Sequence, residues 1–184
     1  MIDDILKASE NGYKILEEIL EWAKTQRDST VLDPQQINIL ILIEEIIDSL
    51  IITAANKRIE FIKVIPENAV FYADKNMTTI VSRNLLSNAI KFSHPGGKII
   101  LSSALESRKA TTSIQNFGVG ISPNELSSLL TNTFKTSRQG ALGEKGTGQG
   151  LLLSRELIFK NNGSIEVESE QEKGTTFKII LPVE

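Results

Sequence analysis

Apolar residues recur every three or four positions from the start of the chain, and this spacing predicts one long amphipathic helix over residues 2–26. Lys and Glu separate the apolar positions, which are Ile2, Ile5, Leu6, Tyr13, Leu16, Ile19, Leu20 and Ala23. An isolated apolar stripe is stable only against a partner surface. That surface is either the same domain or, as we favour, another helix in a coiled coil, including one from a second copy.

After a polar linker at residues 28–34, short strands alternate with longer helical stretches. The expected strands cover residues 36–39, 59–65, 69–72, 98–105, 111–115, 164–169 and 175–181. The expected helices cover residues 40–56, 75–92 with Asp74 as the cap, a short stretch from Ser122-Pro123, and 150–160. The predicted class is α+β: a two-layer α/β sandwich with helices on one face of a mixed sheet, preceded by the separate long helix.

Residues 131–148 interrupt this pattern. The segment holds four glycines with many Thr, Ser and Lys residues, and its large apolar residues are Phe134 and Leu142. A loop of this length inside a compact domain is typically functional. We expect a mobile lid over a binding site.

Composition excludes several classes of protein. Lys plus Arg is 20 and Asp plus Glu is 23, so no basic excess indicates binding to nucleic acid. Cys is absent, which excludes disulfides and thiolate metal sites. No stretch approaches about 18 uncharged apolar residues, and the acidic start lacks the basic residues of a signal peptide. We therefore expect a soluble, cytoplasmic chain, which is compatible with a membrane-anchored parent.

Three polar residues share one face of the predicted helix 75–92. Asn84, Asn88 and Lys91 stand at i, i+4 and i+7. Two amides and an ammonium group are not residue types expected in a hydrophobic core. Amide oxygens are hard neutral ligands suited to Mg²⁺, and an ammonium is a point charge suited to phosphate. The alternative is an ordinary solvated stripe, and spacing alone does not decide between them.

Two glycine-rich segments add to this stripe. Gly118 and Gly120 follow a predicted strand and allow close approach of backbone to a flat ligand, although such a pair is also common in plain turns. Gly146, Gly148 and Gly150 open the helix at 150–160. Alternating glycines at a helix start expose N–H groups to an anion, which favours phosphate binding over a simple flexible loop.

Together and in this order, these segments resemble the Bergerat-type (GHKL-type) ATPases, a family that includes gyrase-type topoisomerases, heat-shock chaperones, mismatch-repair proteins and histidine kinases. Within it, the sequence is similar to the ATP-binding catalytic domains of sensor histidine kinases over roughly residues 33–184. The matching segments are Asn84 to Ser93, Asn116 to Ile121, Phe134, Gly146 to Leu151, Gly174 to Phe177, and Leu181-Pro182. Residues 1–27 resemble the second helix of the dimerisation hairpin, which gives domains at 1–27 and 35–184 joined by the linker 28–34.

The resemblance implies a set of ATP-binding residues and a Mg²⁺ cofactor. Asn88 would ligate Mg²⁺, Asn84 and Lys91 would support the metal and phosphates, and Thr176 would lie near the adenine through water. The implied ATP-binding residues are Asn84, Asn88, Lys91, Phe92, Asn116, Gly118, Gly120, Ile121, Phe134, Gly146, Thr147, Gly148, Gly150, Leu151 and Thr176.

The resemblance also implies partners. They are a response-regulator receiver domain and a phospho-accepting helix from the same or a second subunit, with a homodimeric parent. The accepting His lies on the first helix of the hairpin, which this sequence lacks. The single His, His94, precedes Pro-Gly-Gly in a predicted turn and is an ordinary loop residue, so autophosphorylation of this chain on His is not expected.

One departure from the family pattern bears on affinity. Asn116 stands where the family has an Asp that accepts the adenine amino proton, and Gln149 replaces a Leu. Loss of the charge predicts ATP binding weaker by roughly 5- to 30-fold. The alternatives are that the family site tolerates Asn at this position or that the substitution was engineered. Two alternatives to a histidine kinase domain remain open: a degenerate, non-catalytic scaffold of the same fold, and an anti-sigma-factor-type Ser kinase, which residues 1–27 disfavour.

Overall fold

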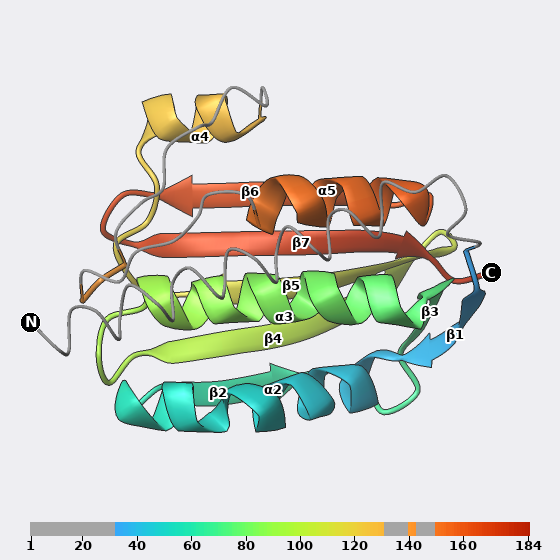
Figure 1. Ribbon diagram of the computed structural model, residues 1–184, viewed down its shortest axis with the longest axis horizontal. Coiled ribbons are helices and arrows are strands. Elements are labelled where there is room, and N and C mark those ends of the chain that lie inside the picture. Colours follow the sequence, from blue (N-terminus) through green and yellow to red (C-terminus); the bar gives the residue numbers. More distant parts are fainter. Residues whose placement is uncertain (1–31, 131–139, 143–149) are drawn as a thin grey trace, which may run out of the picture. The chain divides into compact units, whose positions relative to one another are not determined.

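The computed structural model describes residues 32–130, 140–142 and 150–184 (Figure 1). The predicted helix 2–26, the linker up to residue 31, and the lid apart from residues 140–142 lie outside the described residues. The compact unit formed by residues 33–184 contains the strands β1 (Pro34–Asn38), β2 (Glu60–Val64), β3 (Val70–Asp74), β4 (Lys98–Glu106), β5 (Lys109–Asn116), β6 (Ser164–Glu170) and β7 (Gly174–Pro182). Its helices are α2 (Ile39–Asn56), α3 (Lys75–Phe92), α4 (Pro123–Leu130) and α5 (Gly150–Lys160).

The main sheet is mixed, as predicted. Its five strands lie in the order β2-β4-β5-β7-β6, with β2 parallel to β4 and every other neighbouring pair antiparallel. The helices α2, α3 and α5 lie side by side over one face of this sheet (Figure 1). The two-layer α/β sandwich is therefore confirmed. The predicted strands near residues 36–39 and 69–72 form a separate antiparallel pair, β1 with β3.

Strand alternation decides which side chains face the helices. On β5, Ala110, Thr112, Ile114 and Asn116 are buried, while the residues between them are half-buried. Buried positions of β7 also alternate, at Thr175, Phe177, Ile179 and Leu181. The core lies between these two rows and the apolar faces of α2, α3 and α5.

Helix α3 starts where the sequence predicts. The Asp74 side chain caps it by accepting a hydrogen bond of 3.0 Å from the Met77 N–H. Its buried face includes Met77, Val81, Leu85 and Ala89, as expected, whereas Ile80 is only half-buried. The neighbouring helix α2 begins in the same way.

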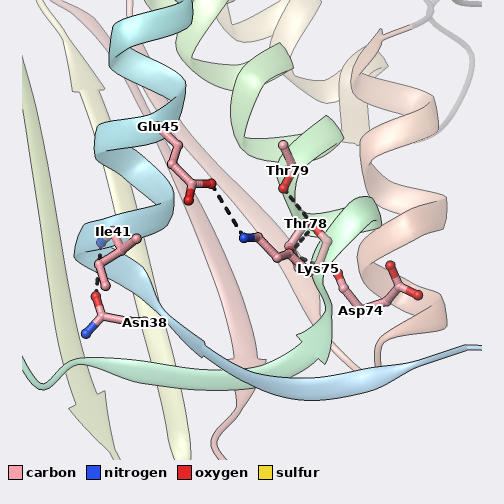
Figure 2. A network of polar contacts seen from close by, with 7 residues as sticks. All are labelled: Asn38, Ile41, Glu45, Asp74, Lys75, Thr78 and Thr79. Atoms are coloured by element: carbon pink, nitrogen blue, oxygen red, sulfur yellow. Dashed lines mark hydrogen bonds and ion pairs between the residues drawn. The ribbon is translucent and has the colours of Figure 1, made fainter.

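Figure 2 shows the starts of α2 and α3 next to each other. The Asn38 side chain accepts a hydrogen bond of 3.0 Å from the Ile41 N–H and caps α2. Lys75, at the start of α3, lies 3.6 Å from the Glu45 carboxylate on α2. Both charged side chains are about half exposed, so this ion pair contributes little to stability.

A buried amide joins the end of α5 to the start of α3. Asn161, which follows the last residue of α5, accepts a hydrogen bond of 2.6 Å from the Asp74 N–H through Oδ1. Its Nδ2 donates to the Leu157 carbonyl at 2.8 Å and lies 3.4 Å from the Met77 sulfur. The side chain is 5% exposed, so both of its polar atoms are satisfied inside the protein. No described helix is long and apolar enough to cross a membrane.

Candidate functional site

The two amides of the predicted polar stripe lie together on α3, facing the start of α5. Asn88 donates through Nδ2 to Asn84 Oδ1 at 3.4 Å, and Asn84 donates through Nδ2 to Ser154 Oγ at 2.8 Å. Ser154 is buried and in turn donates to the Gly150 carbonyl at 2.8 Å. Asn84 and Asn88 are half-buried. The stripe is therefore a packed seam between two helices and not a freely solvated face.

Gly150 allows this close approach. A Cβ atom at Gly150 would lie 2.4 Å from Asn84 Oδ1, which is shorter than the contacts that real Cβ atoms make. Any side chain at this position would displace the Asn84 amide. The first residue of α5 is therefore held directly against the stripe because it is Gly.

The end of α3 brings Lys91 and Phe92 to the same region. The Lys91 ammonium lies 4.9 Å from the centre of the Phe92 ring, within the range of a cation–π contact. The Lys91 carbonyl accepts from Lys57 Nζ at 2.6 Å and from the Ala141 N–H at 3.1 Å. Through this second bond, residue 141 is fixed to the end of the stripe.

Gly118 and Gly120 let the chain after β5 lie against two other backbone segments. A Cβ at Gly118 would lie 1.8 Å from the Phe92 carbonyl oxygen, so no larger residue fits there without moving the backbone. Gly120 has a φ of +60°, and its Cβ would lie 2.0 Å from the Glu170 carbonyl oxygen. Both glycines are thus required by close backbone contacts. The contact at Gly118 ties the end of α3 to the end of β5.

Asn116 lies at the end of β5 and is 2% exposed. Its Nδ2 has no hydrogen-bond partner among the residues that the structure describes. Across the strand pair it stands opposite Thr175, whose Oγ1 lies 2.8 Å from Ser169 Oγ. Ser169 Oγ also accepts from the Ile121 N–H at 2.9 Å. A buried amide with an unused donor therefore sits beside a small hydroxyl network.

The structure separates Thr176 from the other predicted residues. Thr176 pairs with Gln115, one position away from Asn116, and strand alternation places it on the face of β7 opposite to that of the buried Thr175. Thr175, which is not among the predicted ATP-binding residues, is the threonine that pairs with Asn116 across the two strands. The alternation of Phe177, Ile179 and Leu181 with Lys178 was the sequence signal for this assignment, because Lys178 must face outward.

Four predicted residues lie outside the described residues: Phe134, Gly146, Thr147 and Gly148. Their roles stay predictions. Leu151 is half-buried in the first turn of α5. Contacts join Asn84, Asn88 and Gly150 in one group, and Lys91, Phe92 and Gly118 in another at the end of α3. Asn116, Gly120 and Ile121 lie at or just after the end of β5.

The chemistry of this set suits a ligand that brings its own charge. In the described part of the chain, no group of three or more His, Cys, Asp or Glu residues is placed to hold a metal ion. The bond between the two amides uses the amino group of Asn88 and leaves its oxygen as an acceptor atom for a hard cation. A neutral amide oxygen is a weak ligand alone, so Mg²⁺ fits here as an ion held largely by phosphate oxygens. Neither amide can act as a general base.

Comparisons with known proteins show the family to which the chain belongs. A family model described as "Histidine kinase-, DNA gyrase B-, and HSP90-like ATPase" matches residues 73–184. The adaptive-response sensory kinase SasA of Synechococcus elongatus is 30% identical over 172 residues, covering 92% of this chain and 44% of SasA. The circadian input-output histidine kinase CikA of Synechocystis is 29% identical over 185 residues, covering 97% of this chain and 24% of CikA. The chain thus spans less than half the length of these relatives.

The fold is also found among solved structures. The catalytic domain of histidine kinase ThkA, in a nucleotide-free form, superposes with a TM-score of 0.71 at 26% identity, covering 82% of this chain and 96% of that domain. A structure of ThkA in complex with the response regulator protein TrrA shares the fold, with a TM-score of 0.74 at 24% identity, covering 95% of this chain and 49% of that one. From fold, site and sequence together, the chain belongs to the histidine kinase-, DNA gyrase B- and HSP90-like ATPases, as a histidine kinase-type catalytic domain.

Proposed function

We propose that this chain is the ATP-binding catalytic domain of a two-component sensor histidine kinase. It binds Mg-ATP against the amide stripe of α3, beside the start of α5, and transfers the γ-phosphoryl group to a His on a separate helix. The observation that carries this proposal is the contact of Asn84 with Gly150 and Ser154 at the start of α5, together with the hydrogen bond from Asn88 to Asn84. Backbone N–H groups at such a start attract phosphate.

Each part of the site has a defined task in this proposal. Asn88 holds Mg²⁺, which neutralises phosphate charge when bound, and Asn84 orients Asn88 through their hydrogen bond. Lys91 supplies a positive charge to the phosphates, while Phe92 packs beside the nucleotide. Gly146, Gly148 and the backbone amides through Leu151 would cradle the triphosphate, and Thr147 and Phe134 stay predicted ATP-binding residues. The chain contributes positioning and electrostatics and forms no covalent intermediate.

The amide at position 84 favours transfer over hydrolysis, and the place of His94 indicates that the acceptor is a different His. Hydrolysis requires a group that takes a proton from water, and an amide at position 84 cannot do so. The only His of the sequence is also unsuited as acceptor. His94 is exposed, and its carbonyl accepts from the Gly97 N–H at 3.0 Å in a turn, whereas a phospho-accepting His must reach the γ-phosphate of its own or another subunit.

The proposed partners follow from the family. ThkA has been solved with a response regulator protein, and we propose a receiver domain as the partner of this chain also. Residues 1–27 serve as the second helix of a dimerisation hairpin in a homodimeric parent, and the domain works in the cytoplasm. Asn116 lies at the adenine end of the site and lowers ATP affinity by roughly 5- to 30-fold relative to an Asp at this position.

Calorimetry of ATP binding tests the proposal. We expect the chain to bind ATP more tightly with Mg²⁺ than with EDTA, and Asn88→Ala to remove most of that difference. Asn76→Ala is the matched control, because Asn76 is an exposed amide near the other end of the same helix. If saturating Mg-ATP gives neither heat nor a change in melting temperature, the chain is a non-catalytic scaffold. If Mg-ATP does bind, transfer in trans is tested by adding radiolabelled ATP and a separate hairpin that carries the phospho-accepting His.

A further inference from the structure

The unpaired side-chain N–H₂ of Asn116 points to a nucleotide site that accepts purine bases other than adenine. This inference rests on the proposed function. Asn116 is 2% exposed, and its Nδ2 is one of two buried side-chain atoms without a hydrogen-bond partner among the described residues. The other is Thr112 Oγ1, and Thr112 lies on the same buried face of β5 as Asn116, with Ile114 between them. Buried polar atoms are almost always paired, so each such exception calls for an explanation.

The described neighbours of Asn116 accept no hydrogen bond from its Nδ2. Thr175 lies across the strand pair, but its hydroxyl is engaged with Ser169 at 2.8 Å. Ser169 Oγ also contacts the Gly174 carbonyl at 2.8 Å and accepts from the Ile121 N–H. Because Ser169 donates its hydrogen to the Gly174 carbonyl, Thr175 donates to Ser169, and none of these bonds involves Asn116. A bound ligand that presents an acceptor would satisfy the amide.

We infer that Asn116 lets this site accept 6-oxopurine nucleoside triphosphates as well as ATP. An amide carries a donor and an acceptor side by side. With Oδ1 toward the 6-amino group and Nδ2 toward N1, it pairs with both polar atoms on that edge of adenine. Rotated by half a turn, it donates to the 6-oxo group and accepts from the N1–H of hypoxanthine or guanine. Both edges are matched by one side chain.

A carboxylate at position 116 cannot do this. Its two oxygens are acceptors only, so it pairs with a 6-amino group. With a 6-oxopurine it can accept from the N1–H but has no donor for the 6-oxo oxygen, which carries like partial charge. A site built around a specific hydrogen bond rejects the analogue that leaves its polar groups unpaired. The change from carboxylate to amide therefore removes the penalty against 6-oxopurines and at the same time loosens the hold on adenine.

Binding of ATP and of inosine triphosphate, each with Mg²⁺, tests the inference by calorimetry. Inosine triphosphate carries the 6-oxo group without the 2-amino group of guanine, so it isolates the effect of position 6. We expect the two dissociation constants of the natural chain to agree within about 3-fold. Asn116→Asp should make the site prefer ATP by at least about 10-fold, through tighter ATP and weaker inosine triphosphate.

A matched control uses the other unpaired atom. Thr112→Val removes a buried hydroxyl without a partner from the same strand face and should leave the ratio of the two affinities unchanged. The Asn116 side-chain N–H₂ signals in a ¹⁵N spectrum should also shift on addition of inosine triphosphate. ATP binding without inosine triphosphate binding, or a ratio unaffected by Asn116→Asp, overturns the inference and leaves the proposed function standing. If neither nucleotide binds, the proposed function itself fails.

Discussion

Replacing Asn161 by Ala should destabilise the domain without changing its affinity for nucleotide. Asn161 links the end of α5 to the start of α3 through the Asp74 N–H at 2.6 Å and the Leu157 carbonyl at 2.8 Å. The proposed nucleotide site lies along Asn84 and Asn88, farther along the same two helices. The Ala variant therefore tests whether the two helices are held together independently of the site.

The size of the effect follows from the bonds that are lost. The Asp74 N–H becomes a buried donor without a partner, which costs about 1–3 kcal/mol. The Leu157 carbonyl still accepts from the Asn161 N–H at 3.3 Å, so the loss of its second bond costs less. We expect a decrease of about 2–3 kcal/mol in the free energy of unfolding. Since domains are stable by only about 5–15 kcal/mol, this is a large fraction of the total.

Urea unfolding followed by circular dichroism measures this change, with Asn76→Ala as the control. Asn76 is exposed near the start of α3, where Ala has a slightly higher helix propensity, so the control should be neutral or mildly stabilising. A decrease below about 0.5 kcal/mol for Asn161→Ala would show that water reaches the Asp74 N–H, and the reasoning from burial would be wrong. A loss of Mg-ATP affinity in a still folded Asn161→Ala protein would refute the claimed independence.

Two further predictions concern the proposed site. Gly118→Ala should cost about 2 kcal/mol or more and weaken nucleotide binding, because its Cβ would lie 1.8 Å from the Phe92 carbonyl oxygen and break the Val119 N–H bond to it. Thermal unfolding and calorimetry check this, and an unchanged melting temperature would contradict it. Thr175→Val should reduce ATP affinity, whereas Thr176→Val should not, since only Thr175 shares a face with Asn116. Equal effects of the two substitutions in calorimetry would refute this placement.

Local signals in the sequence predicted the helices well. Asp74 offers a capping carboxylate before a long amphipathic run, and the predicted bounds of 75–92 match α3 at both ends. Helix α5 was likewise placed correctly at Gly150–Lys160. These features depend on residues within one or two turns of each other, so the sequence alone contains enough information to place them.

Pairings between distant residues were the part that could not be predicted. Strands β1 and β3 were expected from their composition, but their pairing apart from the main sheet depends on contacts across more than thirty residues. The bond between Asn161 and Asp74 joins residues 87 positions apart, and no local pattern indicates it. The position of Thr175 could be predicted locally. The alternation of buried Phe177 with half-buried Lys178 in β7 already places Thr175, and not Thr176, on the buried face.

Asn116 and Asn161 show why residue type and burial do not by themselves reveal function. Both are buried amides, at 2% and 5% exposure, and neither is distinguished from the other by composition or spacing. Asn161 uses its donor and its acceptor within the protein, so its role in the fold is complete. Asn116 leaves its donor without a partner in the described chain, which costs stability that the fold alone does not recover. A ligand would recover it, and for this reason we assign Asn116, and not Asn161, to recognition.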